Sequence, residues 1–420
     1  MIRVRIAPSP TGFAHVGTAY TALFNYAFAK KKDGVFVVRI EDTDVSRHVK
    51  DAEEAIFKGL SWLGIEHQES VKKKGRFGPY RQSEKLEVYK KKAEELVKSG
   101  LAYKDEGAIR FKNPGKDVSW DDKVRGEITF PGGEITDFVI LKSDGYPTYN
   151  FAVVIDDLAM EITHVIRGEE HVSNTPRQLA LYKAFEEDAP IFAHHSTLRN
   201  KKKQKLSKRR DPVDLKMFKK KGYLPEALVN YLCLLGWSHP KEKEIFSLDE
   251  FVKEFTLERI RKSGPIFDTE KLDWLNGEYI RKMDDGELVE RIDKFCSGKY
   301  ETEKLTKIIP LVKERIKLLS EFEDYVDFFF KSPKVKKSLL GENSKKHLSA
   351  AVKVLGKVNF EKEEMDKALL EEIKKNDFHT GKFFMDLRIA ITGNKQTPPI
   401  NESIIILGKE ETLKRIKAVL

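Results

Sequence analysis

Residues 1–40 read MIRVRIAPSPTGFAHVGTAYTALFNYAFAKKKDGVFVVRI, and this stretch predicts the fold of the N-terminal part of the chain. Apolar residues alternate with arginines over residues 2–6, which is the pattern of a short strand. A helical pattern follows over residues 17–32. The near-continuous apolar run over residues 35–40 is typical of a buried parallel strand. Strand, turn, helix and strand in this order form one βαβ unit, so we expect an α/β domain.

The turn Ala7–Thr18 inside this unit has features of a nucleotide site. A helix that begins near Gly17 would point free backbone N–H groups back at the turn, where anions bind. Because Gly17 has no Cβ, a base or a phosphate can approach the backbone. His15 could donate a hydrogen bond to a phosphate oxygen whose charge grows during a reaction. The turn contains neither of the commoner phosphate loops. Taken alone, such a motif is more often an ordinary βα turn with a packing glycine and a surface histidine.

A second motif, Lys205-Leu206-Ser207-Lys208-Arg209, lies in a basic run far along the chain. Basic runs are usually solvated or bind nucleic acid in a general way. Here an apolar residue and a serine stand between Lys205 and Lys208, so one anchor and two cations can face the same ligand. Lysines on a loop can meet a pyrophosphate leaving group as its charge develops. The two motifs together therefore indicate one nucleotide site.

The rest of the chain of 420 residues predicts about two to four structural units. Residues 103–136 are polar and contain glycine, which indicates an insertion with short strands of its own. Apolar strand patterns return in three runs, at 137–142, 151–155 and 162–166. We therefore expect an α/β domain that the insertion splits, and after residue 211 the pattern becomes helical almost throughout.

Composition limits the class of protein. The formal net charge of +10 would suit a polyanionic partner such as nucleic acid. Most of these charges could simply face water, so charge alone leaves the two interpretations at about even odds. No run of about twenty uncharged apolar residues exists, so we expect no membrane span, and the charged N-terminus does not resemble a signal peptide. Cys233 and Cys296 stand apart without a CxxC pattern, which argues against disulfides and a thiolate zinc site. We expect a cytoplasmic protein.

The two motifs resemble the HIGH and KMSKS signatures of class I aminoacyl-tRNA synthetases, and the whole chain is similar to bacterial-type glutamyl-tRNA synthetases. Several segments of six to eight residues occur in the family's order and carry the resemblance: Arg5–Gly12, Arg39–Asp44, Gly78–Ser83, Ser143–Tyr149, Val165–His171, Tyr231–Trp237 and Leu272–Gly277. The resemblance implies an α/β fold, with an interrupted Rossmann-like catalytic domain, a small α/β insertion, and all-helical stem-contact and anticodon-binding domains.

The implied domain boundaries agree with the segmentation read from the sequence pattern. They are the catalytic domain's first half at 1–72, an acceptor-end insertion at 73–136, the catalytic domain's second half at 137–210, a stem-contact region at 211–302 and a helical anticodon-binding domain at 303–420.

The resemblance also implies the site residues. The substrate side chain would be a carboxylate, and a buried carboxylate needs a cation with fork geometry, such as arginine. The implied glutamate site consists of Arg5, Ala7, Ser9, Glu41, Tyr149 and Arg167. The implied ATP site consists of Gly17, Glu170, Leu198, Lys205, Leu206, Ser207, Lys208 and Arg209, and the catalytic residues are His15, Lys205 and Lys208. Each arginine could instead form an ordinary ion pair.

The implied reaction needs no nucleophilic side chain. The glutamate α-carboxylate attacks the α-phosphorus of ATP, Mg²⁺-pyrophosphate leaves, and the terminal ribose 2′-OH of tRNA(Glu) then takes the glutamyl group. The resemblance implies that bound tRNA precedes activation. Thr18 replaces the second histidine of the first signature, and Ala102–Gly107 contains no cysteine where many relatives hold zinc, so we expect no metal site. We expect a monomer.

Three alternatives stay open at this point. Arg315 aligns with a position where some relatives read the last anticodon base, but it could equally be a solvated residue. Without base reading, the enzyme would also charge tRNA(Gln) with glutamate. A glutaminyl enzyme is disfavoured, because its family ends in β-barrels whereas residues 305–420 read as helical. A non-catalytic RNA-binding protein would explain the charge, but not Glu41 and two strand-borne arginines beside a nucleotide turn.

Overall fold

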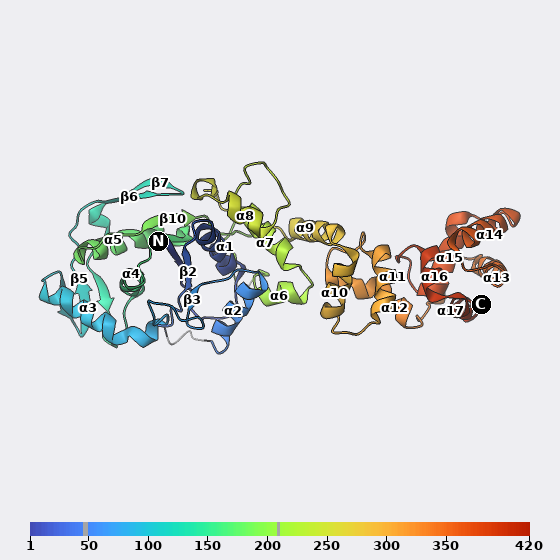
Figure 1. Ribbon diagram of the computed structural model, residues 1–420, viewed down its shortest axis with the longest axis horizontal. Helices are drawn as coiled ribbons and strands as arrows, with labels where there is room; N and C mark the ends of the chain where they lie inside the picture. Colours follow the sequence, from blue (N-terminus) through green and yellow to red (C-terminus); the bar gives the residue numbers. More distant parts are fainter. Residues whose placement is uncertain (45–48, 208–210) are drawn as a thin grey trace. The chain divides into compact units, whose positions relative to one another are not determined.

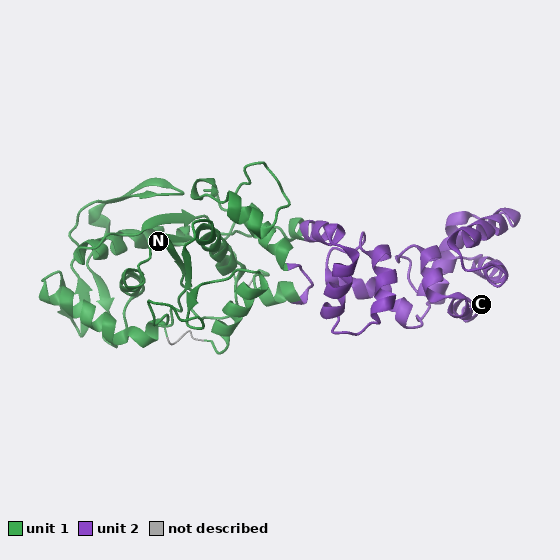
Figure 2. Ribbon diagram, in the orientation of Figure 1, with its two compact units in different colours: residues 1–219, 225–272 green, residues 220–224, 273–420 purple. Residues whose placement is uncertain are grey.

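The computed structural model describes residues 1–420 except 45–48 and 208–210. It divides into two compact units, shown in Figure 2. The first unit comprises residues 1–219 and 225–272, and the second comprises residues 220–224 and 273–420.

The first unit is built on parallel strands. Strand β1 (Arg3–Ile6) pairs with β2 (Val35–Val38), which pairs with β3 (Glu69–Ser70). Strands β9 (His164–Gly168) and β10 (Ile191–His195) form a second parallel pair. Strand β9 lies beside β1, and the N–H of Thr163 donates to the carbonyl of Arg3 over 2.9 Å.

The strand order therefore reverses between β1 and β9. From β1 the chain continues outward to β2 and β3, whereas β9 and β10 lie on the other side of β1. In α/β sheets, ligands bind outside the carboxyl ends of the strands at such a switch point.

Helix α1 (Val16–Lys31) packs on the strands and is buried over most of its circumference. It contacts β1, β2 and β9, and also α2 (Ala52–Trp62), α7 (Pro225–Gly236) and α8 (Leu248–Glu254). Lysines in its last turn complement the helix dipole, and Asp33 with a φ of 48° turns the chain out of the helix. The βαβ unit predicted from residues 1–40 is confirmed (Figure 1).

Helix α4 (Tyr149–Ala159) lies on the other side of β1 and β2 (Figure 1). The strand predicted at residues 151–155 is wrong, because these residues form the middle of this helix. The sequence of a short apolar run does not tell a buried strand from a buried helix, because in either structure the residues are apolar on all sides. In the structure Phe151 and Val154 pack in a core with Tyr89 and Ile140.

A buried ionic network joins α4 to the strands. The carboxylate of Asp157 accepts hydrogen bonds from Arg5 (3.1–3.3 Å) and from Arg39 (2.7 Å), and all three side chains are less than 5 % exposed. The neighbouring Asp156 accepts from Lys85 over 2.6 Å. Burial alone would raise the pKa of Asp157, but the two guanidinium groups outweigh it and lower the pKa.

The insertion contains short strands, as the sequence predicted. After α3 (Leu86–Lys98), β4 (Ala102–Asp105) pairs antiparallel with β5 (Ala108–Phe111), and β5 pairs with β8 (Phe138–Leu141). Strand β8 thus joins the sheet of the insertion, although the sequence pattern placed it in the second half of the catalytic domain.

A hairpin of β6 (Val118–Asp122) and β7 (Gly126–Phe130) leaves this sheet. Its strand β6 contacts β10 of the parallel pair and helix α5 (Thr175–Ala184). The hairpin therefore brings a piece of the insertion to strand β10 of the parallel pair.

The chain after residue 211 is helical, as predicted, and no strand occurs among its described residues. Its remaining helices are α6 (Leu215–Lys220), α9 (Thr269–Lys282), α10 (Asp285–Phe295), α11 (Thr302–Val312), α12 (Phe322–Phe330), α13 (Ser344–Leu355), α14 (Lys362–Lys375), α15 (Thr380–Thr392), α16 (Ile400–Leu407) and α17 (Lys409–Lys417). Helices α13 to α17 share one core that includes Leu348, Leu369 and Leu387. Within the part of the chain that the structure describes, no helix is long and apolar enough to cross a membrane.

The Asp157 network predicts a large stability effect. Asp157→Asn removes the charge that two buried guanidinium groups share, so we expect the free energy of unfolding to fall by about 3–5 kcal/mol in urea denaturation. The control is Asp249→Asn, which breaks a 2.9 Å pair with Lys30 whose side chains are 48 % and 84 % exposed. That change should cost less than about 1 kcal/mol. Equal losses in both variants would contradict the importance of the buried network.

Candidate active site

A pocket of about 550 Å³ opens at the carboxyl ends of β1 and β9. Its walls come from the turn after β1, the first turns of α1, the start of α4 and the segments that follow β9 and β10. The predicted site residues that line it are Arg5, Ala7, Ser9, His15, Gly17, Glu41, Tyr149, Arg167, Glu170, Leu198, Lys205 and Leu206. Residues that are distant in sequence thus meet at the strand-order switch point.

Four predicted site residues are not in this wall. Ser207 follows the lining residue Leu206 but does not line the pocket, and its N–H donates to Asp211 over 2.9 Å. Lys208 and Arg209 lie outside the described residues. Arg315 belongs to the second unit, where it is exposed in the turn that follows α11 and donates its N–H to the carbonyl of Val312.

Backbone pairing brings the two sequence motifs together. The N–H of Val16 donates to the carbonyl of Val213 over 2.8 Å, and the N–H of Leu215 donates to the carbonyl of Ala14 over 3.0 Å. His15 and Asp214 form the antiparallel bridge between these bonds. The segment just after the basic motif is therefore fastened to the turn just before α1.

The N–H groups at the start of α1 are not free, which corrects the expectation of an anion site built from them. Val16 N–H bonds to Val213, and Thr18 N–H bonds to the carbonyl of His15. Gly17 N–H donates to His15 Nδ1 over 2.8 Å. The reason is that the histidine caps the helix with its own side chain, as serine or aspartate does elsewhere.

This cap determines what His15 can donate. Since Nδ1 accepts a hydrogen bond from Gly17, a neutral ring carries its proton on Nε2. A Cβ on residue 17 would lie 3.0 Å from this Nδ1, so glycine is the residue that leaves the cap undisturbed. His15 therefore presents an N–H donor, fixed in tautomer, to the pocket that it lines.

The basic motif is anchored by its leucine. Leu206 is buried, and its N–H donates to the carbonyl of the buried Leu198 over 3.1 Å. The preceding Lys205 extends its ammonium group into the pocket wall, where it forms a 2.8 Å ion pair with Glu170. The Lys205 side chain is 61 % exposed, so a ligand can reach it.

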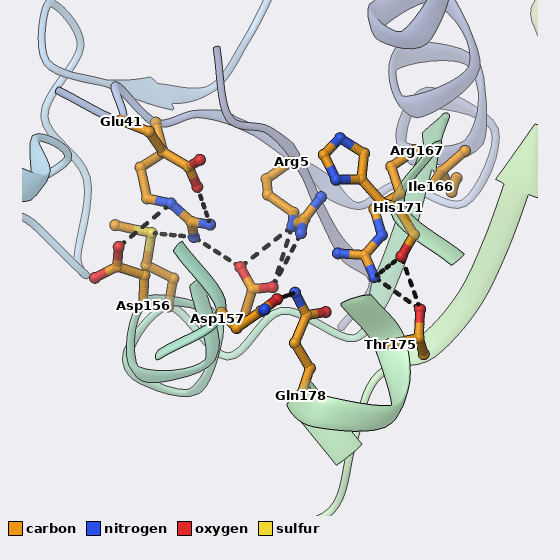
Figure 3. A network of polar contacts seen from close by, with 12 residues as sticks. Arg5, Glu41, Asp156, Asp157, Ile166, Arg167, His171, Thr175 and Gln178 are labelled. Carbon is orange, nitrogen blue, oxygen red and sulfur yellow. Dashed lines mark hydrogen bonds and ion pairs between the residues drawn. The ribbon is translucent and has the colours of Figure 1, made fainter. Parts of the chain in front are cut away.

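The two arginines of the pocket differ in their partners (Figure 3). Arg5 is paired with the carboxylate of Asp157. Arg167 is also buried, but it donates to Thr175 Oγ1 (2.9 Å) and to His194 Nε2 (3.0 Å), which are neutral acceptors. Its Nη1 has no hydrogen-bond partner among the described residues.

Arg167 is therefore a buried cation that contacts no carboxylate within the described part of the chain. Burial, with a contribution from Arg5, lowers its pKa below the usual arginine value. A ligand carboxylate would supply both the missing acceptor and the missing countercharge, and arginine binds such a group with two parallel hydrogen bonds.

Glu41 supplies a negative group on the same pocket. Its side chain is 8 % exposed and accepts a hydrogen bond from Arg39 over 3.2 Å. Burial raises the pKa of Glu41 to about 7, although Arg39 and Arg5 partly oppose this shift. An ionised Glu41 can bind an ammonium group.

Tyr149 and His171 are neutral groups of the same pocket. Tyr149 lies within 3.2 Å of His171 Nδ1 through its hydroxyl. Burial and the charge of Arg167 lower the pKa of His171 to about 4, so this ring is neutral at pH 7.

Sequence reasoning missed several residues of the site. His171, His195, Thr21 and Thr197 line the pocket, and His194 contacts Arg167 behind it. One signal in the sequence could have pointed to His194 and His195. They stand at the carboxyl end of strand β10, and polar residues at the carboxyl end of a parallel strand are expected near a ligand site. No cluster of three metal-ligating side chains occurs in the described ranges 1–44, 49–207 and 211–420.

Comparison with known proteins agrees with this geometry. Residues 1–108 and 105–274 match the family model for the catalytic domain of tRNA synthetases class I (E and Q). Residues 287–420 match the model for an anticodon binding domain.

Curated relatives match along the whole chain. The glutamate–tRNA ligase of Carboxydothermus hydrogenoformans is 40 % identical over 475 aligned residues, which cover 99 % of this chain and 99 % of the relative. Glutamate–tRNA ligase 1 of Fervidobacterium nodosum is 39 % identical and covers 100 % of this chain and 99 % of its own length.

Solved structures show the same fold. The crystal structure of a glutamate tRNA ligase from Elizabethkingia meningosepticum in complex with its amino acid superposes with a TM-score of 0.90 at 32 % identity, over 100 % of this chain and 99 % of that one. The glutamate-tRNA synthetase from Elizabethkingia anophelis superposes with a TM-score of 0.86 at 33 % identity and the same coverage. With the pocket, the motifs and these full-length matches in agreement, the chain belongs to the class I tRNA synthetases (E and Q).

Proposed function

We propose that this chain is a glutamate–tRNA ligase that joins L-glutamate to the 3′-terminal ribose of tRNA(Glu) through a glutamyl-adenylate. The observation that carries the proposal is a single pocket lined by two chemically different groups of residues. The first group is Arg5, Glu41 and Arg167, and the second is His15 and Lys205. The full-length relatives named glutamate–tRNA ligase support the same activity and disfavour a non-catalytic RNA-binding protein.

The first group of residues, Arg5, Glu41 and Arg167, suits glutamate. The side-chain carboxylate would pair with Arg167, whose Nη1 has no acceptor in the described chain, and with Arg5. Glu41, in its ionised form, would bind the α-ammonium group. Ser9 and Tyr149 would donate hydroxyl hydrogen bonds, and Ala7 would leave room beside them. Glutamine lacks the negative charge that a buried guanidinium requires, so the site favours glutamate.

The second group of residues, His15 and Lys205, suits ATP, which would enter as its Mg²⁺ complex. Gly17, Leu198 and Leu206 would form the surface against the nucleotide, and Glu170 would lie beside it. The α-carboxylate of glutamate attacks the α-phosphorus, and pyrophosphate leaves. His15 Nε2–H and Lys205 would stabilise the growing negative charge. The proposed ATP site also includes Ser207, Lys208 and Arg209, an assignment that rests on the sequence motif alone.

The tRNA would contact the remaining domains. The proposed ranges are 73–136 for the acceptor end, 211–302 for the stem and 303–420 for the anticodon. The charge of +10 supports binding to a polyanion. Arg315 is exposed, and together with burial its charge lowers the pKa of Arg388, so the two arginines lie near each other in the second unit. We propose that Arg315 contacts the anticodon and that the protein acts as a cytoplasmic monomer without zinc.

The central test is exchange of pyrophosphate into ATP, followed by charging of purified tRNAs. We expect exchange that depends on both glutamate and tRNA, and charging of tRNA(Glu) with glutamate. Lys208→Ala should nearly abolish both. Exchange that is equally fast with glutamine would overturn the substrate assignment. Charging of tRNA(Gln) with glutamate would show a non-discriminating enzyme in which Arg315 does not exclude the second tRNA.

Lys205 predicts an effect on turnover. Lys205→Met removes a cation that meets charge developing in the transition state, so we expect kcat to fall about 10²- to 10³-fold with little change in KM for glutamate. The matched control is Lys202→Met on the same segment, where the lysine is exposed and does not line the pocket. Similar losses in the two variants would mean that the segment acts only through its overall charge.

Glu41 predicts a pH dependence of glutamate binding. Because its pKa is raised to about 7, the carboxylate is mostly protonated at pH 6 and mostly ionised at pH 8. Affinity for an ammonium group should therefore rise about tenfold over this range, and binding near pH 6 should release a proton. Calorimetry in buffers of different ionisation enthalpy measures both quantities. Glu41→Gln should bind weakly with a flat profile, whereas a flat profile in the unaltered protein would refute the role.

A further inference from the structure

The turn of the β6–β7 hairpin is fastened to the end of β10. The N–H of Lys123 donates to the carbonyl of Phe192 over 2.9 Å. Arg125 donates from Nε to the carbonyl of His194 over 3.2 Å and forms an ion pair with Glu169. A segment of the insertion thus lies directly behind the strand that precedes the nucleotide pocket.

Asp122 is the buried centre of this turn. Its side chain is fully buried, and its Oδ1 accepts three backbone N–H groups, from His194, Val124 and Arg125, over 3.0–3.1 Å. Its Oδ2 lies 2.5 Å from His194 Nδ1. Burial alone would disfavour the ionised form, but the contacts with His194 and the backbone N–H groups lower the pKa of Asp122, which therefore stays a carboxylate.

The other ring nitrogen of His194 contacts Arg167. The distance from Arg167 Nε to His194 Nε2 is 3.0 Å. An arginine can only donate, so Nε2 must be the unprotonated nitrogen and accept. The ring proton then lies on Nδ1 and points at Asp122, an ionised group that can only accept. Asp122, His194 and Arg167 therefore form a chain in which every proton has one possible position.

The imidazole between the two charges has a consequence for the ligand. A carboxylate in direct contact would occupy the guanidinium fork and neutralise it, as Asp157 does for Arg5. With His194 as the contact, Arg167 donates from Nε to the imidazole and from Nη2 to Thr175 and the carbonyl of His171, while Nη1 remains without a partner among the described residues. The ring of Phe192, 5.3 Å from the guanidinium carbon, supports the arginine from one side.

We propose that Asp122 and His194 are positioning residues for Arg167, which they hold in the orientation that receives the carboxylate of the amino-acid substrate. This inference deepens the proposed function and rests on it. It also means that a residue of the β6–β7 hairpin, acting through a histidine of strand β10, contributes to how tightly the amino acid is held.

The decisive variant is Asp122→Asn. The amide oxygen can still accept the three backbone N–H groups, but the amide N–H₂ now donates to His194 Nδ1. The ring proton moves to Nε2 and opposes the Nε–H of Arg167. We expect KM for glutamate to rise about tenfold to a hundredfold, with KM for ATP and KM for tRNA nearly unchanged. The melting temperature should fall by a few degrees, because two buried donors then lack an acceptor. The matched control, Asp121→Asn, changes an exposed carboxylate next door and should leave all of these values as they are.

A double-mutant cycle tests whether Asp122 acts through the histidine. In His194→Gln the amide oxygen can accept from Arg167 whatever residue 122 is, so KM for glutamate should rise less than in Asp122→Asn. Adding Asp122→Asn to His194→Gln should then have no further effect. Independent, multiplying effects of the two substitutions would overturn the proposal.

Two further outcomes separate this inference from the proposed function. If the unaltered protein shows no exchange with glutamate, the proposed function fails. If the unaltered protein is active and Asp122→Asn leaves KM for glutamate within twofold, or raises the three KM values equally, the positioning role alone fails. Should Asp122→Asn not fold, His194→Leu against His194→Gln tests the same acceptor, and equal KM values in these two variants would refute it.

Discussion

Charge that is buried under the parallel strands governs the architecture of the first unit. Arg5 in β1 and Arg39 just after β2 project into the interior, and each is paired there with a carboxylate, which offsets the cost of burying the charge. Asp157 on α4 supplies it, with distances of 2.7–3.3 Å. Because one carboxylate serves two guanidinium groups, the position of α4 against the strands is determined, and α4 in turn carries Tyr149 to the wall of the pocket.

The site uses the same physics in the opposite sense. Arg167 is as buried as Arg5, yet its partners are a histidine, a threonine and a carbonyl. A buried cation with no countercharge raises the free energy of the empty protein and is relieved when an anion binds. The two arginines of one pocket therefore differ in their electrostatic surroundings: Arg5 is paired with Asp157, whereas Arg167 has no carboxylate partner among the described residues.

Much of the fold could be predicted because it depends on local patterns. Alternation over residues 2–6, the helix over 17–32 and the helical C-terminal part all appear in the structure. The strand predicted at residues 151–155 was wrong for a physical reason. The segment is buried on all sides, so its apolar residues show no helical periodicity. The free N–H groups expected at α1 were also wrong, because whether a histidine caps its own helix depends on a rotamer that no pattern of residue types reveals.

By itself the sequence determined the family, the order of the elements and the identity of the residues that carry charge into the pocket, because short motifs and hydrophobic periods are properties of neighbouring residues. Only the tertiary structure decided which charges neutralise each other. That Asp157 pairs with Arg5, and that Asp122 reaches Arg167 through His194, depends on distances between segments that lie far apart in the chain. Electrostatic pairing inside a protein is set by burial and by ångström-scale separations, which exist only after folding.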